Sequence, residues 1–113
     1  MSLKDLREAN LKRSAEWMGV DALPYEDILF RAVELGGEAG EALNIVKKYS
    51  RFLKRAKGGV NYRETSEELA KELADIIICC DRLAYSFQID LKDAVKEKFN
   101  ETSQKHGFKT LMK

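Results

Sequence analysis

The sequence predicts an all-α fold: a helical bundle of four main helices in a single domain covering residues 1–113, completed by oligomerisation. Apolar residues recur at the 3.6-residue spacing of amphipathic helices along most of the chain. The 113 residues include one proline, and 44% are apolar while 35% are charged, a composition typical of a helix-rich globular chain. A domain of this size gains much by sharing its core with other copies, so we expect a homodimer or a tetramer.

The first predicted helix runs from Leu3 to Met18. Leu3, Leu6, Asn10, Leu11, Ser14 and Trp17 lie on roughly one side of it. Gly19 would end this helix and Pro24 would open the next one. Trp17 is interpreted as a packing anchor, with stacking against a nucleotide base as the alternative.

The second predicted helix runs from Tyr25 to about Ala56 and organises the rest of the chain. Its apolar stripe consists of Leu35, Ala39, Ala42, Val46 and Tyr49. Glu34, Glu38 and Glu41 follow the edge of this stripe, and because like charges at this spacing repel, we expect a positive group nearby. Gly36, Gly37 and Gly40 each cost a helix roughly 1 kcal/mol relative to alanine, which predicts the close approach of another backbone or a ligand.

Residues 57–63 read as a glycine-containing connection, either a lid or an ordinary surface loop, before a third helix that ends near Phe87. Thr65 and Glu68 have the capping-box spacing that would begin this helix. Its predicted core stripe consists of Leu69, Leu73, Ile76, Cys80, Leu83 and Phe87. Glu68, Glu72 and Asp75 lie along the edge of that stripe.

The two acidic helices would bring their carboxylates together if they packed by their apolar stripes. Glu38 and Glu41 would then face Glu72 and Asp75, forming an oxygen-rich pocket of the kind that holds Mg²⁺. The alternative is that these side chains are ordinary solvated helix surface.

The fourth predicted helix begins after Asp90, a suitable N-cap, and ends near Lys105. Lys96 and Asn100 are four residues apart and share one face of it, which would add a cationic side to the pocket. The tail from Phe108 to Lys113 would either fold over the body or fray.

The motifs Glu38-Ala39-Gly40-Glu41 and Glu72-Leu73-Ala74-Asp75 resemble the ExxE…ExxD signature of MazG-like all-α nucleoside triphosphate pyrophosphohydrolases. The similarity covers roughly residues 25–110 and includes the segments RAVELGGEAGEALNIVKK, ELADIIICCDRLA and KFNETSQKHGF. Gly37 stands where many members carry a glutamate, and Glu34, one turn earlier, would take over part of that role or none of it. The resemblance implies a helical, usually dimeric enzyme that needs Mg²⁺ and splits a nucleotide between its α- and β-phosphates.

The resemblance also implies roles for individual residues. Mg²⁺, or Mn²⁺ in its place, would be held by Glu38, Glu41, Glu72 and Asp75. One of Glu34, Glu38 and Glu41 would act as general base towards water. The substrate would be contacted by Lys96 and Asn100, and by Lys105 in place of a basic residue where Ser103 stands. Independently of the resemblance, Trp17 would form part of a hydrophobic slot for the base.

Two other classes of function remain as alternatives. A redox di-metal carboxylate protein generally pairs ExxH motifs, and neither acidic helix contains a histidine. A non-catalytic helical dimerisation or partner-binding module would keep the scaffold without the activity. Neither a Walker-type glycine loop nor a Ser-His-Asp or Cys-His arrangement occurs.

Net charge and cysteine content indicate which partners and which cellular compartment to expect. The formal net charge of +1, from 20 basic and 19 acidic side chains, argues against a dedicated nucleic-acid binder. The N-terminus lacks an apolar signal segment and no long apolar run occurs, so we expect a cytoplasmic protein without membrane contact. Cys79 and Cys80 are adjacent and predicted to be small, reduced, buried or half-buried residues.

Overall fold

The computed structural model describes residues 1–18, 28–55 and 61–113, and all regular structure within these ranges is helical. The helices are α1 (Leu3–Met18), α2 (Ile28–Arg55), α3 (Tyr62–Ser86) and α4 (Leu91–Lys105). The all-α prediction is confirmed, as is the extent of the first helix. The predicted break at 19–24, the start of the second helix at Tyr25, its end at Ala56 and residues 57–60 of the connection lie outside the described residues.

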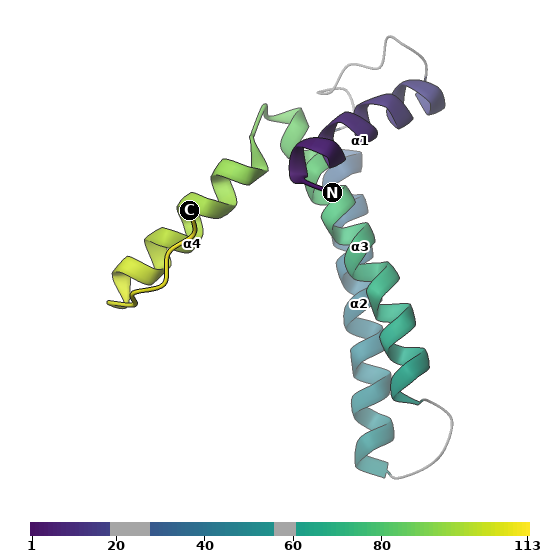
Figure 1. Cartoon of the computed structure of the whole chain (residues 1–113). Helices are drawn as coiled ribbons and strands as arrows, with labels where there is room; N and C mark the ends of the chain where they lie inside the picture. Colours follow the sequence, from purple (N-terminus) through teal and green to yellow (C-terminus); the bar gives the residue numbers. More distant parts are fainter. Residues whose placement is uncertain (19–27, 56–60) are drawn as a thin grey trace.

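Helices α2 and α3 run side by side in opposite directions and form the central pair of the molecule (Figure 1). Ala42 of α2 is buried, in agreement with the predicted stripe, whereas Val46 is 47% exposed. The stripe predicted for α3 is partly wrong, because Leu73 and Phe87 are exposed while Thr65 and Cys79 are buried. A single helix pair buries only one narrow strip of each partner, so much of each apolar stripe stays uncovered.

Helix α1 is held on the C-terminal half of α3 by polar contacts. Asp81 is 2% exposed, and its Oδ1 accepts a hydrogen bond from Arg7 Nε at 2.9 Å while its Oδ2 accepts one from Asn10 Nδ2 at 2.9 Å. Arg7 also donates to the backbone oxygen of Ile89 at 2.9 Å and lies over the ring of Tyr85. The pattern of apolar residues did not indicate this attachment.

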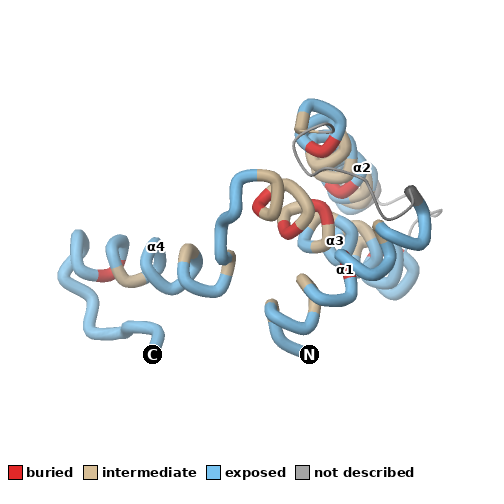
Figure 2. The backbone as a smooth tube through the Cα atoms, turned by 90° about the horizontal axis from the view of Figure 1, so that it is seen from above, coloured by how far each residue is buried: buried red, intermediate tan, exposed pale blue. Residues whose placement is uncertain are grey.

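The start of α2 is tied to the end of α3 by the buried guanidinium of Arg31. Its Nη1 donates to the backbone oxygen of Arg82 at 3.0 Å and to Ser86 Oγ at 2.8 Å. Buried positions therefore concentrate where α1, α2 and α3 meet, while most other residues are exposed (Figure 2).

The N-cap of helix α3 lies four residues before the threonine of the predicted capping box. Asn61 is its N-cap, and the side-chain oxygen of Asn61 accepts a hydrogen bond from the backbone N–H of Glu64 at 2.8 Å. Thr65 therefore lies inside the helix and is buried. Asparagine caps a helix as well as threonine does, and the earlier of the two candidates prevails here.

Helix α4 leaves the end of α3 and extends away from the α2–α3 pair (Figure 1). Its N-cap is Asp90, as predicted, which accepts a hydrogen bond from the backbone N–H of Asp93. The tail folds back along α4, because the side chain of Asn100 exchanges two hydrogen bonds, of 2.7 and 3.0 Å, with the backbone of Met112. The tail is therefore folded against α4 and not frayed.

Cys79 is buried, Cys80 is half-buried and both thiols are free, as predicted. Among the helices of the described ranges, none combines the length and the apolar character that crossing a membrane would require.

Candidate metal centre

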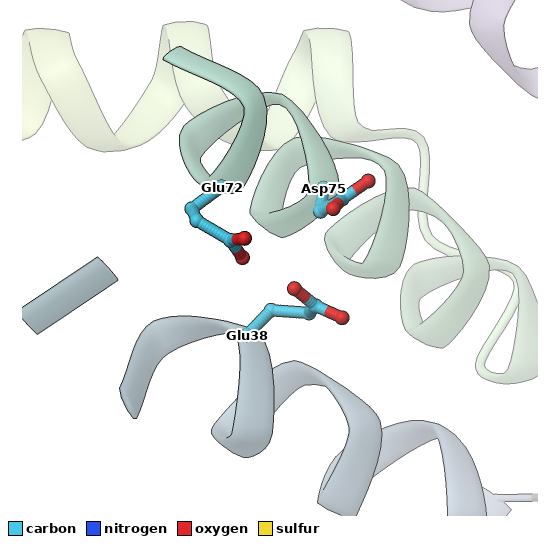
Figure 3. Close-up of side chains that lie close together, drawn as sticks. All are labelled: Glu38, Glu72 and Asp75. Atoms are coloured by element: carbon cyan, nitrogen blue, oxygen red, sulfur yellow. The ribbon is translucent and has the colours of Figure 1, made fainter. Parts of the chain in front are cut away.

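Three carboxylates from α2 and α3 converge on one point between the helices. Glu38 extends from α2, and Glu72 and Asp75 extend from α3 into the same gap (Figure 3). One oxygen from each side chain lies within 4.8 Å of the other two. Glu72 and Asp75 reach the same gap because residues three apart on a helix are neighbours on its surface. The predicted meeting of the two acidic rows is therefore present in the fold.

The negative charge of this cluster lacks a cationic partner within the described residues. The oxygens Glu38 Oε2 and Glu72 Oε2 are buried and accept no hydrogen bond there. The neighbouring carboxyl of Glu38, desolvation by burial and the charge of Glu41 raise the pKa of Glu72 to about 7. The pKa is raised because ionising Glu72 would place its negative charge beside those of Glu38 and Glu41. A divalent cation would offset the same charge.

A fourth carboxylate, that of Glu34, is neutralised by an arginine. Both carboxylate oxygens of Glu34 accept hydrogen bonds from Arg82 Nη1, at 2.9 and 3.1 Å. Arg82 follows Asp75 by seven residues and so lies on the same face of α3. The expected positive group is thus present for Glu34, and within the described ranges no such partner reaches Glu38 or Glu72.

A cavity of about 440 Å³ opens between α1, α2 and α3, and Glu38 and Asp75 form part of its wall. Aromatic and polar side chains complete the lining, namely Asn10, Arg13, Ser14, Trp17, Phe30, Glu34, Ile78, Cys79 and Arg82. Trp17 is 84% exposed and Phe30 is 61% exposed, so neither ring is used up by packing within the described chain. The volume lies in the range of small-molecule binding sites.

Cys79 lines this cavity but is unsuited to act as a nucleophile. Burial, followed by the charges of Glu34 and Glu38, raises the pKa of its thiol to about 11. The thiolate is the reactive form of cysteine, and almost none is present at neutral pH. The residue contributes an apolar wall.

The fold does not bring every predicted site residue to this place. Glu41 is exposed on α2 and acts on the cluster through its charge and proximity to Glu72. Lys96, Asn100 and Lys105 are carried on α4, which points away from the α2–α3 pair, and none of them lines the cavity (Figure 1). Their predicted contact with substrate stays a prediction, and within one chain the amide of Asn100 is engaged by Met112.

The predicted close approach at the glycines of α2 is not found within the described chain. A Cβ atom added at Gly36, Gly37 or Gly40 would meet nothing within 4 Å. All three glycines are exposed.

Sequence reasoning missed Arg13, Phe30 and Arg82 as members of the site. The position of Arg82 could have been predicted from the sequence, because its spacing from Asp75 places both residues on one face of α3. Arg13 and Phe30 had no such signal, since their place in the cavity depends on how α1 crosses the central pair.

Comparisons with protein-family models, with curated proteins and with solved structures found no match to this chain.

Proposed function

We propose that this protein is a Mg²⁺-dependent nucleoside triphosphate pyrophosphohydrolase, which cleaves between the α- and β-phosphates to give a nucleoside monophosphate and pyrophosphate. The observation that carries the proposal is the unpaired Glu38–Glu72–Asp75 cluster at the wall of an aromatic-lined cavity. The motif resemblance to the MazG-like enzymes supports the same reading, and residues 38, 41, 72 and 75 occupy its four acidic positions.

The donor set fits a hard divalent cation. Carboxylate oxygens are the side-chain ligands that Mg²⁺ and Mn²⁺ prefer, and two of the buried oxygens here have no other partner among the described residues. Glu38, Glu72 and Asp75 would hold the ion, with Glu41 beside them. When bound, Mg²⁺ supplies positive charge that allows a triphosphate to approach an acidic wall.

The side chains that line the cavity would bind the base and the phosphates and accept the proton of the attacking water. Trp17 and Phe30 present flat apolar surfaces for a nucleobase. Arg13 supplies positive charge to the phosphates, while Arg82 holds Glu34 in place. Glu34 is thereby engaged and Glu38 belongs to the cluster, so the exposed carboxylate of Glu41 is the group left to accept the proton of the attacking water.

The proposal includes a cytoplasmic homo-oligomer, because many large apolar side chains stay exposed on the single chain. The alternative, a non-catalytic helical module for dimerisation or partner binding, draws on the same exposed surface. The two differ in whether any nucleotide is hydrolysed.

The experiment is a measurement of pyrophosphate release from a panel of canonical and modified nucleoside triphosphates, with Mg²⁺, Mn²⁺ or EDTA. We expect release in either metal, with the matching monophosphate formed in equal amount, and none in EDTA. If the folded protein released no pyrophosphate from any of these nucleotides, the enzymatic proposal would be overturned and the non-catalytic helical module favoured.

A further inference from the structure

Asn10 of α1 is a buried side chain with an unused hydrogen-bond acceptor. The residue is 5% exposed. Its Nδ2 donates to Asp81 Oδ2 at 2.9 Å and to the backbone oxygen of Ile78 at 3.4 Å, both on α3. Its Oδ1 accepts no hydrogen bond from the described residues. Polar atoms of buried residues generally have a partner, so this oxygen is open to one that a ligand supplies.

The two hydrogen bonds from Nδ2 fix the orientation of the amide. A carboxylate and a backbone carbonyl accept hydrogen bonds and donate none, so the nitrogen must be the atom that faces Asp81 and Ile78. Turning the amide over would set Oδ1 against two other acceptors. Donation to a charged carboxylate also strengthens Oδ1 as an acceptor, because hydrogen bonds in a chain polarise one another. Oδ1 is therefore a rigidly placed acceptor.

Asn10 forms part of the wall of the cavity between α1, α2 and α3. Helix α1 turns one face towards this cavity, made of residues at helical spacing, namely Asn10, Arg13, Ser14 and Trp17. On α3, Ile78 follows Asp75 by three residues, a rise of about 4.5 Å along the helix. The amide of Asn10 thus lies about one turn of α3 from the carboxylate cluster. A nucleoside bridges such a separation, with its base at Asn10 and its phosphates towards Asp75.

Bases that differ at one position would meet Oδ1 with opposite groups. Cytosine and adenine carry an exocyclic amino group, which donates, where uracil and hypoxanthine carry a carbonyl oxygen, which accepts. In the same pose that carbonyl would face Oδ1, and two acceptors would lie together without a donor between them. The ring N–H of uracil stands between two carbonyl oxygens, so turning it towards Oδ1 brings one of them near the acceptors of Asp81 and Ile78.

We propose that Asn10 Oδ1 accepts a hydrogen bond from the exocyclic amino group of a nucleobase, and that the site thereby selects cytosine or adenine nucleotides over uracil or hypoxanthine nucleotides. The inference rests on the proposed function for the presence of a nucleotide in the cavity and adds which base it carries. Asn10 precedes residues 25–110, over which the chain resembles the MazG-like enzymes, so the resemblance gives it no role. A site that hydrogen-bonds one group rejects an analogue lacking it, because its own polar atom is then left unpaired.

Trp17 provides a direct probe of base binding. It is the only tryptophan of the chain and it lines the same cavity, so its fluorescence changes when a base stacks nearby, whether or not anything is hydrolysed. The first test is a titration of the full chain with the 5′-monophosphates of cytidine, uridine, adenosine and inosine in Mg²⁺. Within each pair that binds, cytidine against uridine and adenosine against inosine, we expect the amino-bearing base to bind about tenfold more tightly.

This titration separates base selection from catalysis, because a monophosphate has no bond between α- and β-phosphates to cleave. A preference for cytidine monophosphate in a chain that releases no pyrophosphate from any triphosphate would refute the enzymatic function alone. Equal binding within each pair by a chain that hydrolyses triphosphates would refute the base selection alone. Tighter binding of the uridine or inosine nucleotide, or no binding of any of the four, would also overturn the base selection.

The second test is Asn10→Leu, which removes the acceptor while keeping a similar volume. The tenfold preference for cytidine over uridine monophosphate should disappear, so that the two bind about equally. This variant also takes a donor from Asp81, so its matched control is Arg7→Met, which removes another donor from the same carboxylate and does not line the cavity. Arg7→Met should keep the preference. Circular dichroism checks that both variants stay helical.

Two results of the variant test would contradict the role of Oδ1. One is a preference that survives in Asn10→Leu. The other is a preference lost equally in Asn10→Leu and Arg7→Met, which would assign base discrimination to the seating of α1 on α3. If Asn10→Leu does not fold, the titration of the native chain with the four monophosphates decides the proposal by itself.

Discussion

In the described part of the chain, one acidic centre lies at the α1–α3 contact and another at the α2–α3 contact, and their charges are balanced in different ways. At the α1–α3 contact, Asp81 is almost fully buried and both of its oxygens accept hydrogen bonds, from Arg7 and Asn10. At the α2–α3 contact, Glu38 and Glu72 approach Asp75, and a buried oxygen of each has no partner in the described residues.

The contrast separates a structural carboxylate from one available to a ligand. A buried charge is costly unless it is paired, and Asp81 shows that this chain supplies partners where only stability is at stake. Glu34 shows the same through Arg82. The proposed divalent cation would supply the partner that Glu38 and Glu72 lack among the described residues.

The largest effect is expected from neutralising the cluster. Glu38→Gln, Glu72→Gln or Asp75→Asn should each lower pyrophosphate release by on the order of a hundredfold or more while the protein stays helical, because each removes a carboxylate oxygen from the ion. The assay is turnover of the best triphosphate at saturating Mg²⁺.

Glu68→Gln is the control for that experiment. Glu68 is an exposed acid on the same helix, outside the cluster, and its loss should leave turnover unchanged. Full activity in all three cluster variants would show that these carboxylates hold no catalytic ion.

The next effect concerns the structural centre. Asp81→Ala should lower the free energy of unfolding by about 2–3 kcal/mol, because it leaves Arg7 and Asn10 without their acceptor. Urea denaturation measures the change. Mg²⁺-dependent turnover per folded molecule should persist, and its loss would mean that the two centres are not independent.

A smaller effect links pH to metal binding. The raised pKa of Glu72 means that the folded chain holds this proton more tightly than the unfolded chain, whose carboxyl has a pKa near 4.5. Its contribution to stability is full below about pH 4.5 and is lost as pH rises through about 7. Glu72→Gln should remove this part of the pH dependence.

Magnesium should compensate where the proton has left. At tenfold excess over its dissociation constant, Mg²⁺ should raise the melting temperature by about 5 °C at pH 8 and by much less at pH 5.5. Differential scanning fluorimetry of the native chain and Glu72→Gln tests this. Equal stabilisation of both proteins would point to ions bound elsewhere.

The smallest effect is expected from breaking an exposed ion pair, and it shows how little such a pair contributes to stability. The ion pair between Arg63 and Glu67 joins side chains that are 89% and 66% exposed. Glu67→Ala should change the free energy of unfolding by no more than about 0.5 kcal/mol. A loss comparable to that of Asp81→Ala would undermine the distinction between paired buried and paired exposed carboxylates.

The helices and the facing carboxylates could be predicted because each depends on local spacing. The ExxE and ExxD spacings place side chains on one face of a helix wherever that helix lies, so the meeting of Glu38 with Glu72 and Asp75 needed only that α2 and α3 pair. The N-cap at Asp90 is equally local, and it was predicted correctly.

Contacts between distant segments could not be predicted in the same way. The attachment of α1 uses Arg7 and Asp81, 74 residues apart, and polar pairs leave no periodic signal. The start of α3 was misplaced because both Asn61 and Thr65 are suitable N-caps, and Asn61 is the one that caps the helix. The direction of α4 depends on the short turn after Ser86, so the distance of Lys96 from the cluster could not be predicted from the sequence.

The most direct test of the unpaired cluster is a titration of the metal-free chain with Mn²⁺, followed by the electron paramagnetic resonance signal of the free ion. We predict saturable binding to the native chain, its loss in the double variant Glu38→Gln with Asp75→Asn, and its persistence in Glu68→Gln. A native chain that leaves the free-ion signal unchanged, or a double variant that binds as the native chain does, would contradict a metal centre at this place.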